Sequence, residues 1–190
     1  RQMQAEVMEY RSRILRQINK DLQTLHALAG FLEYNYFQDE EHLAQGIQKA
    51  NLENGFVSMA LMPTEGIGLK TSFNNGIDCN ISLNSMSKEE QTVIRQAWQG
   101  ESRVSRLFQA KEDDERIFVY AVPIHRQGKI VAALTASSHV EIFSDILAGN
   151  TVLGGSGYLH LIGSEGDFLV KSSKMIVQED VNNLFEGPYI

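Results

Sequence analysis

The sequence predicts an α+β fold, in which one long helix is followed by an antiparallel sheet with shorter helices. Three observations favour this fold class. Apolar residues recur at three- and four-residue steps through residues 1–37, apolar strand patterns are joined by turns of hairpin length, and the helical patterns come in blocks. Because neighbouring parallel strands need a crossover connection, usually a helix, this order favours an antiparallel sheet over a doubly wound parallel one.

The long helix is expected over residues 1–37. Its apolar stripe consists of Val7, Ile14, Ile18, Leu22, Leu25, Ala29 and Leu32. A stripe of this length and narrowness fits a helix packed on its own domain, and it fits a coiled-coil-like contact with a second copy equally well. Both interpretations can hold for different halves of one helix.

Two shorter helices are expected next. The first covers 40–51, with Asp39 as its N-cap and an Asn-Gly pair after its end. The second follows the capping-box pattern Ser87-Lys88-Glu89-Glu90, runs through Trp98 and ends before Gly100.

Strand patterns occupy much of the remaining chain. The expected strands are 56–62 (FVSMALM, ended by Pro63), a strand entered through TEGIGLK (64–70), a short strand near 103–109, 116–124 (RIFVYAVPI) and 129–137 (KIVAALTAS). The last two are joined by the turn HRQG. An amphipathic helix is then expected over 139–149, and GGSGYLHLIGSEGDFLVKSS (154–173) begins a new pair of strands.

Composition excludes several classes of protein. The formal net charge of −7 argues against a nucleic-acid partner, because phosphate contacts need a basic face. Cys79 is the single cysteine, so neither an intrachain disulfide nor a cysteine-based metal site can form. No apolar run approaches the roughly 20 residues of a membrane span. Since the chain begins at Arg1, we expect it to be a piece of a longer protein.

Enzyme motifs are also missing. A phosphate-binding loop needs its glycines directly before a helix, whereas GGSG precedes an alternating strand. The histidines show no metal-ligand spacing, no GxSxG motif occurs, and the acidic run KEDDER (111–116) is best explained as a solvated loop. We therefore expect no enzymatic activity, no metal and no cofactor.

The order of four segments resembles a known family. They are AWQGESRVSRLF (97–108), IFVYAVPIHRQGKIVAALTAS (117–137), HVEIFSDILAG (139–149) and the 154–173 segment. Together they are similar to the double Cache (PAS-like, PDC) sensor regions of bacterial transmembrane receptors. The resemblance implies a long signalling and dimerisation helix at 1–37, a membrane-distal PAS-like module at 38–148, and a membrane-proximal module from 150 to 190. The last segment is too short to close such a sheet, so we expect the second module to be incomplete in this sequence.

The resemblance also implies a ligand pocket in the distal module. One subset of the family reads α-amino acids through Arg, Trp, Tyr and Asp residues, whose positions fall near Gln91, Val93, Ile94, Phe108 and Ser137 here. Because none of the charged readers is present, we expect the ligand not to be an α-amino acid.

The residues expected to contact the ligand are of two kinds. Phe108, Tyr120 and Ser137 would form apolar walls with one or two hydroxyls, and Arg95 and Arg103 would meet an anionic group. The alternative, which general residue distributions favour, is that these are core aromatics and surface arginines.

The function expected from the resemblance is extracytoplasmic sensing of a small molecule. The parent would be anchored in the bacterial cell membrane, dimerise through the N-terminal helix, and relay ligand state to a cytoplasmic output. The sequence is most similar to receptors of the diguanylate cyclase and phosphodiesterase type, which implies cyclic-di-GMP turnover as the output. The alternative is a ligand-free dimerisation or protein-interaction module of a receptor such as a histidine kinase or chemoreceptor.

Overall fold

The computed structural model describes residues 2–35, 39–74, 76–110, 115–143, 160–162 and 168–171. The chain begins with the long helix α1 (Gln2–Asn35), as the periodicity predicted. Leu25, Ala29 and Leu32 of the predicted apolar stripe are buried, while Ile14, Ile18 and Leu22 are half-buried. The stripe therefore marks the packed side of the helix from its middle onward.

Helix α2 (Glu40–Asn54) is defined at both ends by local capping. The Asp39 carboxylate accepts a hydrogen bond from the Glu41 backbone N–H at 3.1 Å, which satisfies one of the free donors of the first turn. Gly55 ends the helix in the left-handed region at φ 68°. Both signals were predicted, and the helix is three residues longer than the predicted 40–51.

One antiparallel sheet forms the centre of the fold and confirms the α+β class. Its strands are β1 (Ser58–Pro63), β2 (Gly68–Ser72), β3 (Gly76–Ile81), β4 (Arg103–Val104), β5 (Phe108–Gln109), β6 (Arg116–Arg126) and β7 (Lys129–His139). Their order is β3-β2-β1-β7-β6-β4, and β5 also pairs with β6. The β6–β7 hairpin is longer than predicted, because pairing continues to Arg126 and Lys129 across a turn with positive φ at Gln127 and Gly128.

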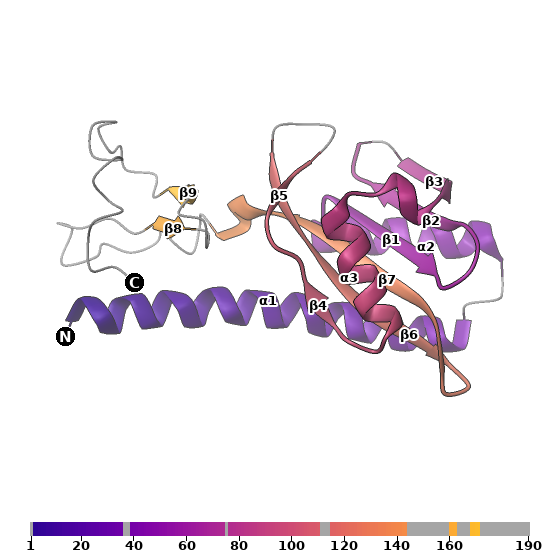
Figure 1. Cartoon of the computed structure of the whole chain (residues 1–190), viewed down its shortest axis with the longest axis horizontal. Coiled ribbons are helices and arrows are strands. Elements are labelled where there is room, and N and C mark those ends of the chain that lie inside the picture. The colour runs from indigo at the N-terminus through magenta and orange to yellow at the C-terminus, as the bar shows by residue number, and fades with distance from the viewer. Residues whose placement is uncertain are drawn as a thin grey trace. The chain divides into compact units, whose positions relative to one another are not determined.

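Helices cover both faces of this sheet (Figure 1). Helix α3 (Lys88–Trp98), with the predicted capping box at Ser87 and Glu90, covers one face. Its C-terminal end is attached to β1, since the Trp98 indole Nε1–H donates to the Met62 carbonyl at 3.0 Å. Helix α2 and the part of α1 from Arg16 onward cover the opposite face.

The remaining described elements are short. They are the 3-10 helices η1 (Leu83–Ser85) and η2 (Val140–Phe143) and the antiparallel strands β8 (His160–Ile162) and β9 (Phe168–Lys171). The strand pair predicted in 154–173 is thus confirmed at these residues. Of the predicted helix 139–149, residues 140–143 form η2, and the part beyond 143 lies outside the described residues.

The chain divides into two compact units. One comprises Arg16–His139, and the other comprises Arg1–Leu15 with Val140–Ile190. The module limits 38–148 and 150–190 remain predictions. None of the described helices has the length and apolar character needed to cross a membrane.

Candidate functional site

The sheet register separates the three uncharged residues that were predicted to contact a ligand. Ser137 lies opposite Val119 of β6, and Phe108 lies opposite Ile117, so both belong to the face that α3 covers. Tyr120 directly follows Val119 on β6, and because successive side chains of a strand alternate, it points to the other face. The structure brings Phe108 and Ser137 to one face and does not bring Tyr120 to them.

The two predicted arginines are exposed and have acceptors of their own. On α3, Arg95 donates from Nη2 to Gln91 Oε1 at 3.3 Å. On β4, Arg103 forms an ion pair with Glu101. Each guanidinium therefore makes a local surface contact, and neither is hydrogen-bonded to Phe108, Tyr120 or Ser137.

Beneath the body of α3, the core is filled by small and medium-sized side chains. This cluster consists of Ala60, Met62, Met86, Val93, Ile94, Ala97, Val119, Ala121 and Ala133, each less than 7% exposed. Phe108 and Trp98 pack against it. Alanines on three strands let the helix approach the sheet closely, so this part of the α3 face is occupied by protein side chains.

A polar region lies beside the first turn of α3. Register places Ser58 and Ser137 two residues beyond Ala60 and Thr135, and the Ser58 hydroxyl donates to the Ser137 hydroxyl at 3.1 Å. Lys70 Nζ lies 3.4 Å from Glu90 Oε1. We refer to Ser58, Lys70, Glu90, Phe108 and Ser137 as the α3 polar end.

The charges of the α3 polar end are internally compensated. Glu90 is 7% exposed, and its other carboxylate oxygen accepts the Ser87 backbone N–H at 2.8 Å. Ser58 and Ser137 are also buried, so this region offers hydroxyl groups and one neutralised ion pair next to an aromatic ring. Sequence reasoning missed Lys70 and identified Glu90 only as a capping residue, because their contact depends on how β2 packs beside α3.

On the opposite face, Tyr120 joins the sheet to α1. Its hydroxyl donates to Asp21 Oδ2 at 2.8 Å, and Gln17 donates to Asp21 Oδ1 at 3.1 Å. Burial raises the pKa of the Asp21 carboxyl, although the bonds from Tyr120 and Gln17 act in the opposite direction. Burial and the neighbouring Asp21 carboxylate raise the pKa of Tyr120 far above its usual value. Tyr120 therefore acts as a neutral donor to a buried acidic group.

Two further polar contacts attach α1 to the same unit. His26 Nε2 lies 3.0 Å from the Ser102 hydroxyl, and Glu33 Oε1 accepts the His125 backbone N–H at 3.2 Å. With the Asp21–Tyr120 bond, these contacts join α1 to positions near β4, on β6 and at the end of β6. These three contacts therefore attach α1 to the sheet at separate places along the helix.

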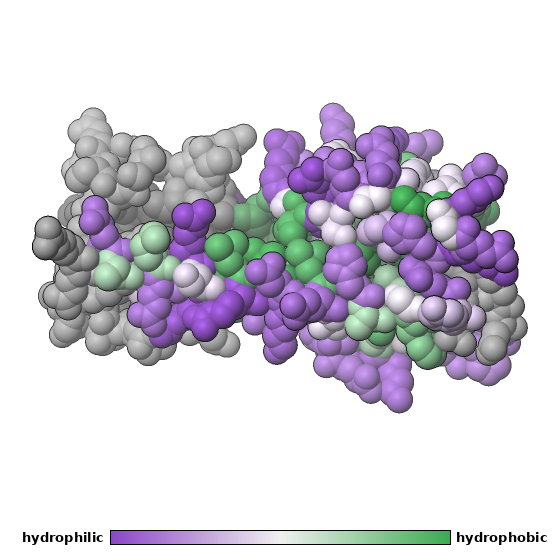
Figure 2. Space-filling view, turned by 90° about the horizontal axis from the view of Figure 1, so that it is seen from below, coloured by the Kyte–Doolittle hydropathy of each residue, from purple (hydrophilic) through white to green (hydrophobic). Residues whose placement is uncertain are grey.

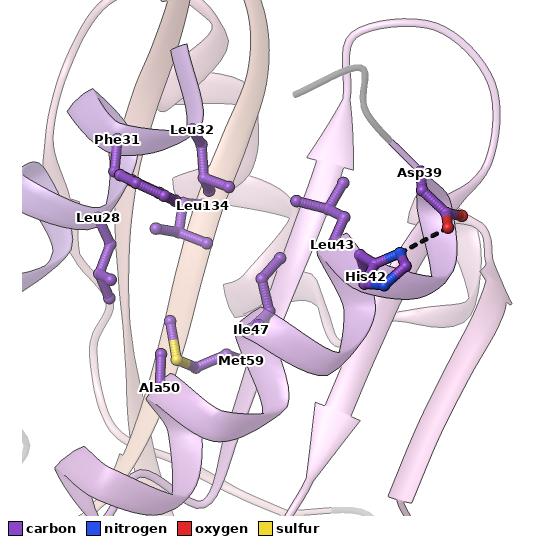
Figure 3. A pocket seen from close by; sticks show the side chains of 11 residues that line it. Leu28, Phe31, Leu32, Asp39, His42, Leu43, Ile47, Ala50, Met59 and Leu134 are labelled. Carbon is purple, nitrogen blue, oxygen red and sulfur yellow. Dashed lines mark hydrogen bonds and ion pairs between the residues drawn. The ribbon is translucent and has the colours of Figure 1, made fainter. Parts of the chain in front are cut away.

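A hollow of about 250 Å³ opens on the same face, between α1, α2 and the sheet (Figure 3). Leucine and phenylalanine side chains of α1 form one wall, and apolar side chains of α2 form the other. Met59 and Leu134 close it from the sheet, and Asp39 and His42 stand at its edge. Among the described residues, no group of three or more His, Cys, Asp or Glu side chains is arranged to hold a metal ion.

Comparison with known proteins identifies the fold. No family model and no curated protein matches the sequence. The sensory domain of the Campylobacter jejuni chemoreceptor Tlp3 (CcmL) is similar in structure, with a TM-score of 0.73 and 13% identity over 97% of this chain and 78% of that chain. The ligand-binding domain of the Pseudomonas aeruginosa PAO1 chemoreceptor PctC, in complex with GABA, gives a TM-score of 0.68 and 17% identity over 87% of this chain and 72% of that chain.

These neighbours support the sequence resemblance at the level of the fold. The first is a chemoreceptor sensory domain, and the second is a chemoreceptor ligand-binding domain. The Tlp3 domain in complex with 4-methylisoleucine has a TM-score of 0.72 and 13% identity, over 100% of this chain and 71% of that chain. The comparisons therefore give no support to the expectation that the ligand is not an α-amino acid, and none to cyclic-di-GMP output.

Proposed function

We propose that this chain is an extracytoplasmic sensing domain of a bacterial membrane receptor and that it binds a small molecule. The observation that carries the proposal is the fold, which nearly the whole chain shares with chemoreceptor sensory domains despite 13–17% identity. The sequence motifs of the double Cache type support the same assignment. The long helix α1 supplies the element through which such a domain would reach the membrane.

The ligand binds at the α3 polar end. The body of the α3 face is packed with side chains, whereas Ser58 and Ser137 present buried hydroxyls past the first turn of the helix. Phe108 adds an aromatic wall on the same face. Apolar side chains with a few placed polar groups are the residues that typically line small-molecule sites.

The chemistry of this end favours a weakly polar ligand over an α-amino acid. An α-amino acid brings an ammonium and a carboxylate, and each needs an opposite charge when it leaves water. Here Lys70 and Glu90 neutralise each other, and Glu90 also holds the Ser87 amide. Binding both charged groups would require this pair to separate, whereas a hydroxyl or carbonyl group needs only the serine hydroxyls.

Binding is relayed through the sheet to α1. A ligand that contacts Ser137 and Phe108 biases the position of β6 and β7, and Tyr120 of β6 is hydrogen-bonded to Asp21 on the other face. If the ligand binds more tightly to one position of the sheet than to another, binding shifts the sheet toward that position, and α1 shifts with it. The coupling is a small shift or rotation of one helix, a common form of interface switching.

The receptor is a homodimer in which α1 contacts its counterpart. Met8, Leu15 and Tyr34 on this helix are 63%, 47% and 88% exposed. The side along which α1 runs shows apolar residues among hydrophilic ones (Figure 2). Sedimentation equilibrium tests this arrangement: Leu15→Glu should weaken self-association, whereas Lys20→Glu, an exposed position on another side of the helix, should not.

The output of the parent receptor is cyclic-di-GMP turnover, and chemotaxis is the second candidate. Motif similarity to diguanylate cyclase and phosphodiesterase receptors supports the first, and the chemoreceptor neighbours support the second. Measuring cellular cyclic-di-GMP and swimming reversal in cells that express the parent, with and without the ligand, separates the two.

A ligand screen tests the sensing function. At a concentration a hundred times its Kd, a ligand adds about 2.7 kcal/mol to stability. For a domain of this size that corresponds to a rise in Tm of about 5–10 °C. Replacing both hydroxyl partners, Ser58→Ala with Ser137→Ala, should abolish this rise with little change in basal stability, because no buried partner is left unpaired.

The control and the contrary outcome are well defined. Ser12→Ala with Thr24→Ala removes two hydroxyls that bond to backbone carbonyls of α1, and it should leave the ligand effect intact. If no small molecule raises the Tm, the ligand-free interaction module is the better assignment. Stabilisation by common α-amino acids would refute the chemistry proposed for the ligand.

A further inference from the structure

The hollow between α1 and α2 is separated from the α3 polar end by the sheet itself. Leu28, Phe31 and Leu32 face it from α1, and Leu43 and Ile47 face it from α2 (Figure 3). Met59 and Leu134 lie on the same face of the sheet as Tyr120. Met59 and Tyr120 both pair with Ala136 of β7, and Leu134 is two residues from Ala136 on that strand. The hollow therefore belongs to the face opposite Ser58 and Ser137.

Buried apolar side chains form the floor of the hollow. Leu134 is 0%, Met59 1%, Ile47 4% and Leu32 7% exposed, so the hollow reaches the packed core. Its volume of about 250 Å³ is smaller than the range of roughly 300–1,000 Å³ typical of drug-sized ligands. A dry apolar cavity of about 150 Å³ holds one benzene molecule. The space thus fits an apolar body about the size of one substituted ring.

A glycine keeps the α2 wall open. Gly46 lies in the interior of α2, where glycine is the least favourable residue apart from proline, and it lines the hollow. A Cβ atom added at this position would meet no atom within 4 Å. Close packing therefore does not require glycine here, and its effect is to leave the hollow accessible beside the helix.

The edge of the hollow is acidic and rich in hydrogen-bond acceptors. Asp39 Oδ2 lies 2.6 Å from His42 Nδ1, and Asp39 Oδ1 accepts the Glu41 amide. The His42 bond and the Glu41 amide hold the pKa of Asp39 below its usual value, so the carboxylate is ionised at neutral pH. Two of its four lone-pair sites remain open to a ligand. Exposed Glu40 and Glu41 add negative charge nearby.

We propose that this hollow is a second binding site, which takes a small amphiphile with an apolar ring or branched aliphatic body and a cationic or hydroxyl head. The body lies on Met59 and Leu134, and the head meets Asp39 at the edge. An anionic head is disfavoured, because it would face Asp39 and the acidic first turn of α2. The site is independent of ligand binding at the α3 polar end.

Methionine methyl NMR tests the site directly. In protein labelled with ¹³C-methyl methionine, benzylammonium should shift the methyl signal of Met59 and leave those of Met62 and Met86, which lie in the α3-face cluster, unchanged. Benzyl alcohol should bind at the same place about fivefold more weakly, since one exposed charge contact is lost. Benzoate should bind more weakly still.

Two variants test which residues contact the apolar body of the probe and which contact its polar head. Gly46→Leu fills the α2 wall and should lower benzylammonium affinity at least tenfold without lowering Tm, because leucine favours the helix. Gln45→Leu is the matched control on the exposed side of α2 and should leave affinity unchanged. Asp39→Asn keeps a good N-cap but removes the charge, so it should bring benzylammonium and benzyl alcohol to similar affinity.

Three results would overturn the proposal. The first is a benzylammonium shift at Met62 or Met86 without one at Met59, and the second is unchanged affinity in Gly46→Leu. The third is dimerisation that Gly46→Leu abolishes, measured by sedimentation without any probe, since the hollow would then hold a second copy of the chain. Because each readout concerns Met59 or Gly46, failure here leaves the proposed sensing at Ser58 and Ser137 to be tested separately.

Discussion

Replacing Tyr120 with phenylalanine removes one hydroxyl from the contact between the sheet and α1. The ring remains packed edge-on against Phe118 and Phe56, at centroid distances of 5.2 and 6.4 Å, so packing is preserved. The hydroxyl donates to a carboxylate that is 8% exposed, and hydrogen bonds to charged groups contribute about 1.5–3 kcal/mol. Gln17 still donates to Asp21, so we expect a loss of about 2 kcal/mol, which lowers Tm by about 4–8 °C.

Urea unfolding followed by circular dichroism at pH 7 measures this loss. Tyr34→Phe is the matched control, because its side chain is 88% exposed and the substitution should change stability by less than about 0.5 kcal/mol. A double-mutant cycle with Asp21→Asn should give a coupling energy of at least about 1 kcal/mol between Tyr120 and Asp21. The hydrogen bond would not join α1 to the sheet if Tyr120→Phe were as stable as Tyr34→Phe, or if the coupling were zero.

Three other perturbations have defined outcomes. Because the pKa of the Asp21 carboxyl is raised, the folded state binds the carboxyl proton more tightly than the unfolded state, and stability should fall as pH rises through the folded pKa. Urea titrations from acid to neutral pH should show this fall in wild type and not in Asp21→Asn. Ser87→Ala removes the capping box of α3 and should cost about 1 kcal/mol by urea unfolding. Gly68→Ala places a Cβ atom 2.6 Å from the Leu61 carbonyl oxygen and against the Met62 sulfur, and should cost about 1–3 kcal/mol in the same assay.

Contrary results for these variants are equally specific. Parallel pH curves for wild type and Asp21→Asn would mean that the carboxyl is not desolvated. An unchanged free energy of unfolding in Ser87→Ala would mean that the cap does not contribute to stability. An unchanged free energy of unfolding in Gly68→Ala would show that β1 and β2 can separate locally without cost.

Features that depend on neighbours in sequence were predictable. The caps at Asp39 and Ser87, the left-handed Gly55 and the β6–β7 turn each involve residues within a few positions, so the local sequence identifies them. Strand β3 was missed because residues 77–80 are exposed, and an edge strand of this kind carries no buried alternation. The α+β class follows from element order, which local patterns define.

Contacts between distant residues were not predictable in the same way. Strand β6 is buried on both faces from Ile117 to Ile124, so no alternation reveals that Tyr120 faces α1 while Val119 faces α3. The Asp21–Tyr120 bond joins residues 99 positions apart, and Lys70 and Glu90 meet only when β2 packs beside α3. The predicted site residues were therefore chosen by type, and the sheet register decided which of them share a face.

Amide hydrogen exchange on the wild-type domain, with and without a compound that raises its Tm, tests ligand sensing most directly. We predict added protection at two places: in β1 and β7 around Ser58 and Ser137, and in α1 around Asp21, on the other side of the sheet. Protection at the first place alone would show binding without relay to α1. Protection at neither place, with any stabilising compound, would contradict the assignment of this chain as a sensing domain that acts through α1.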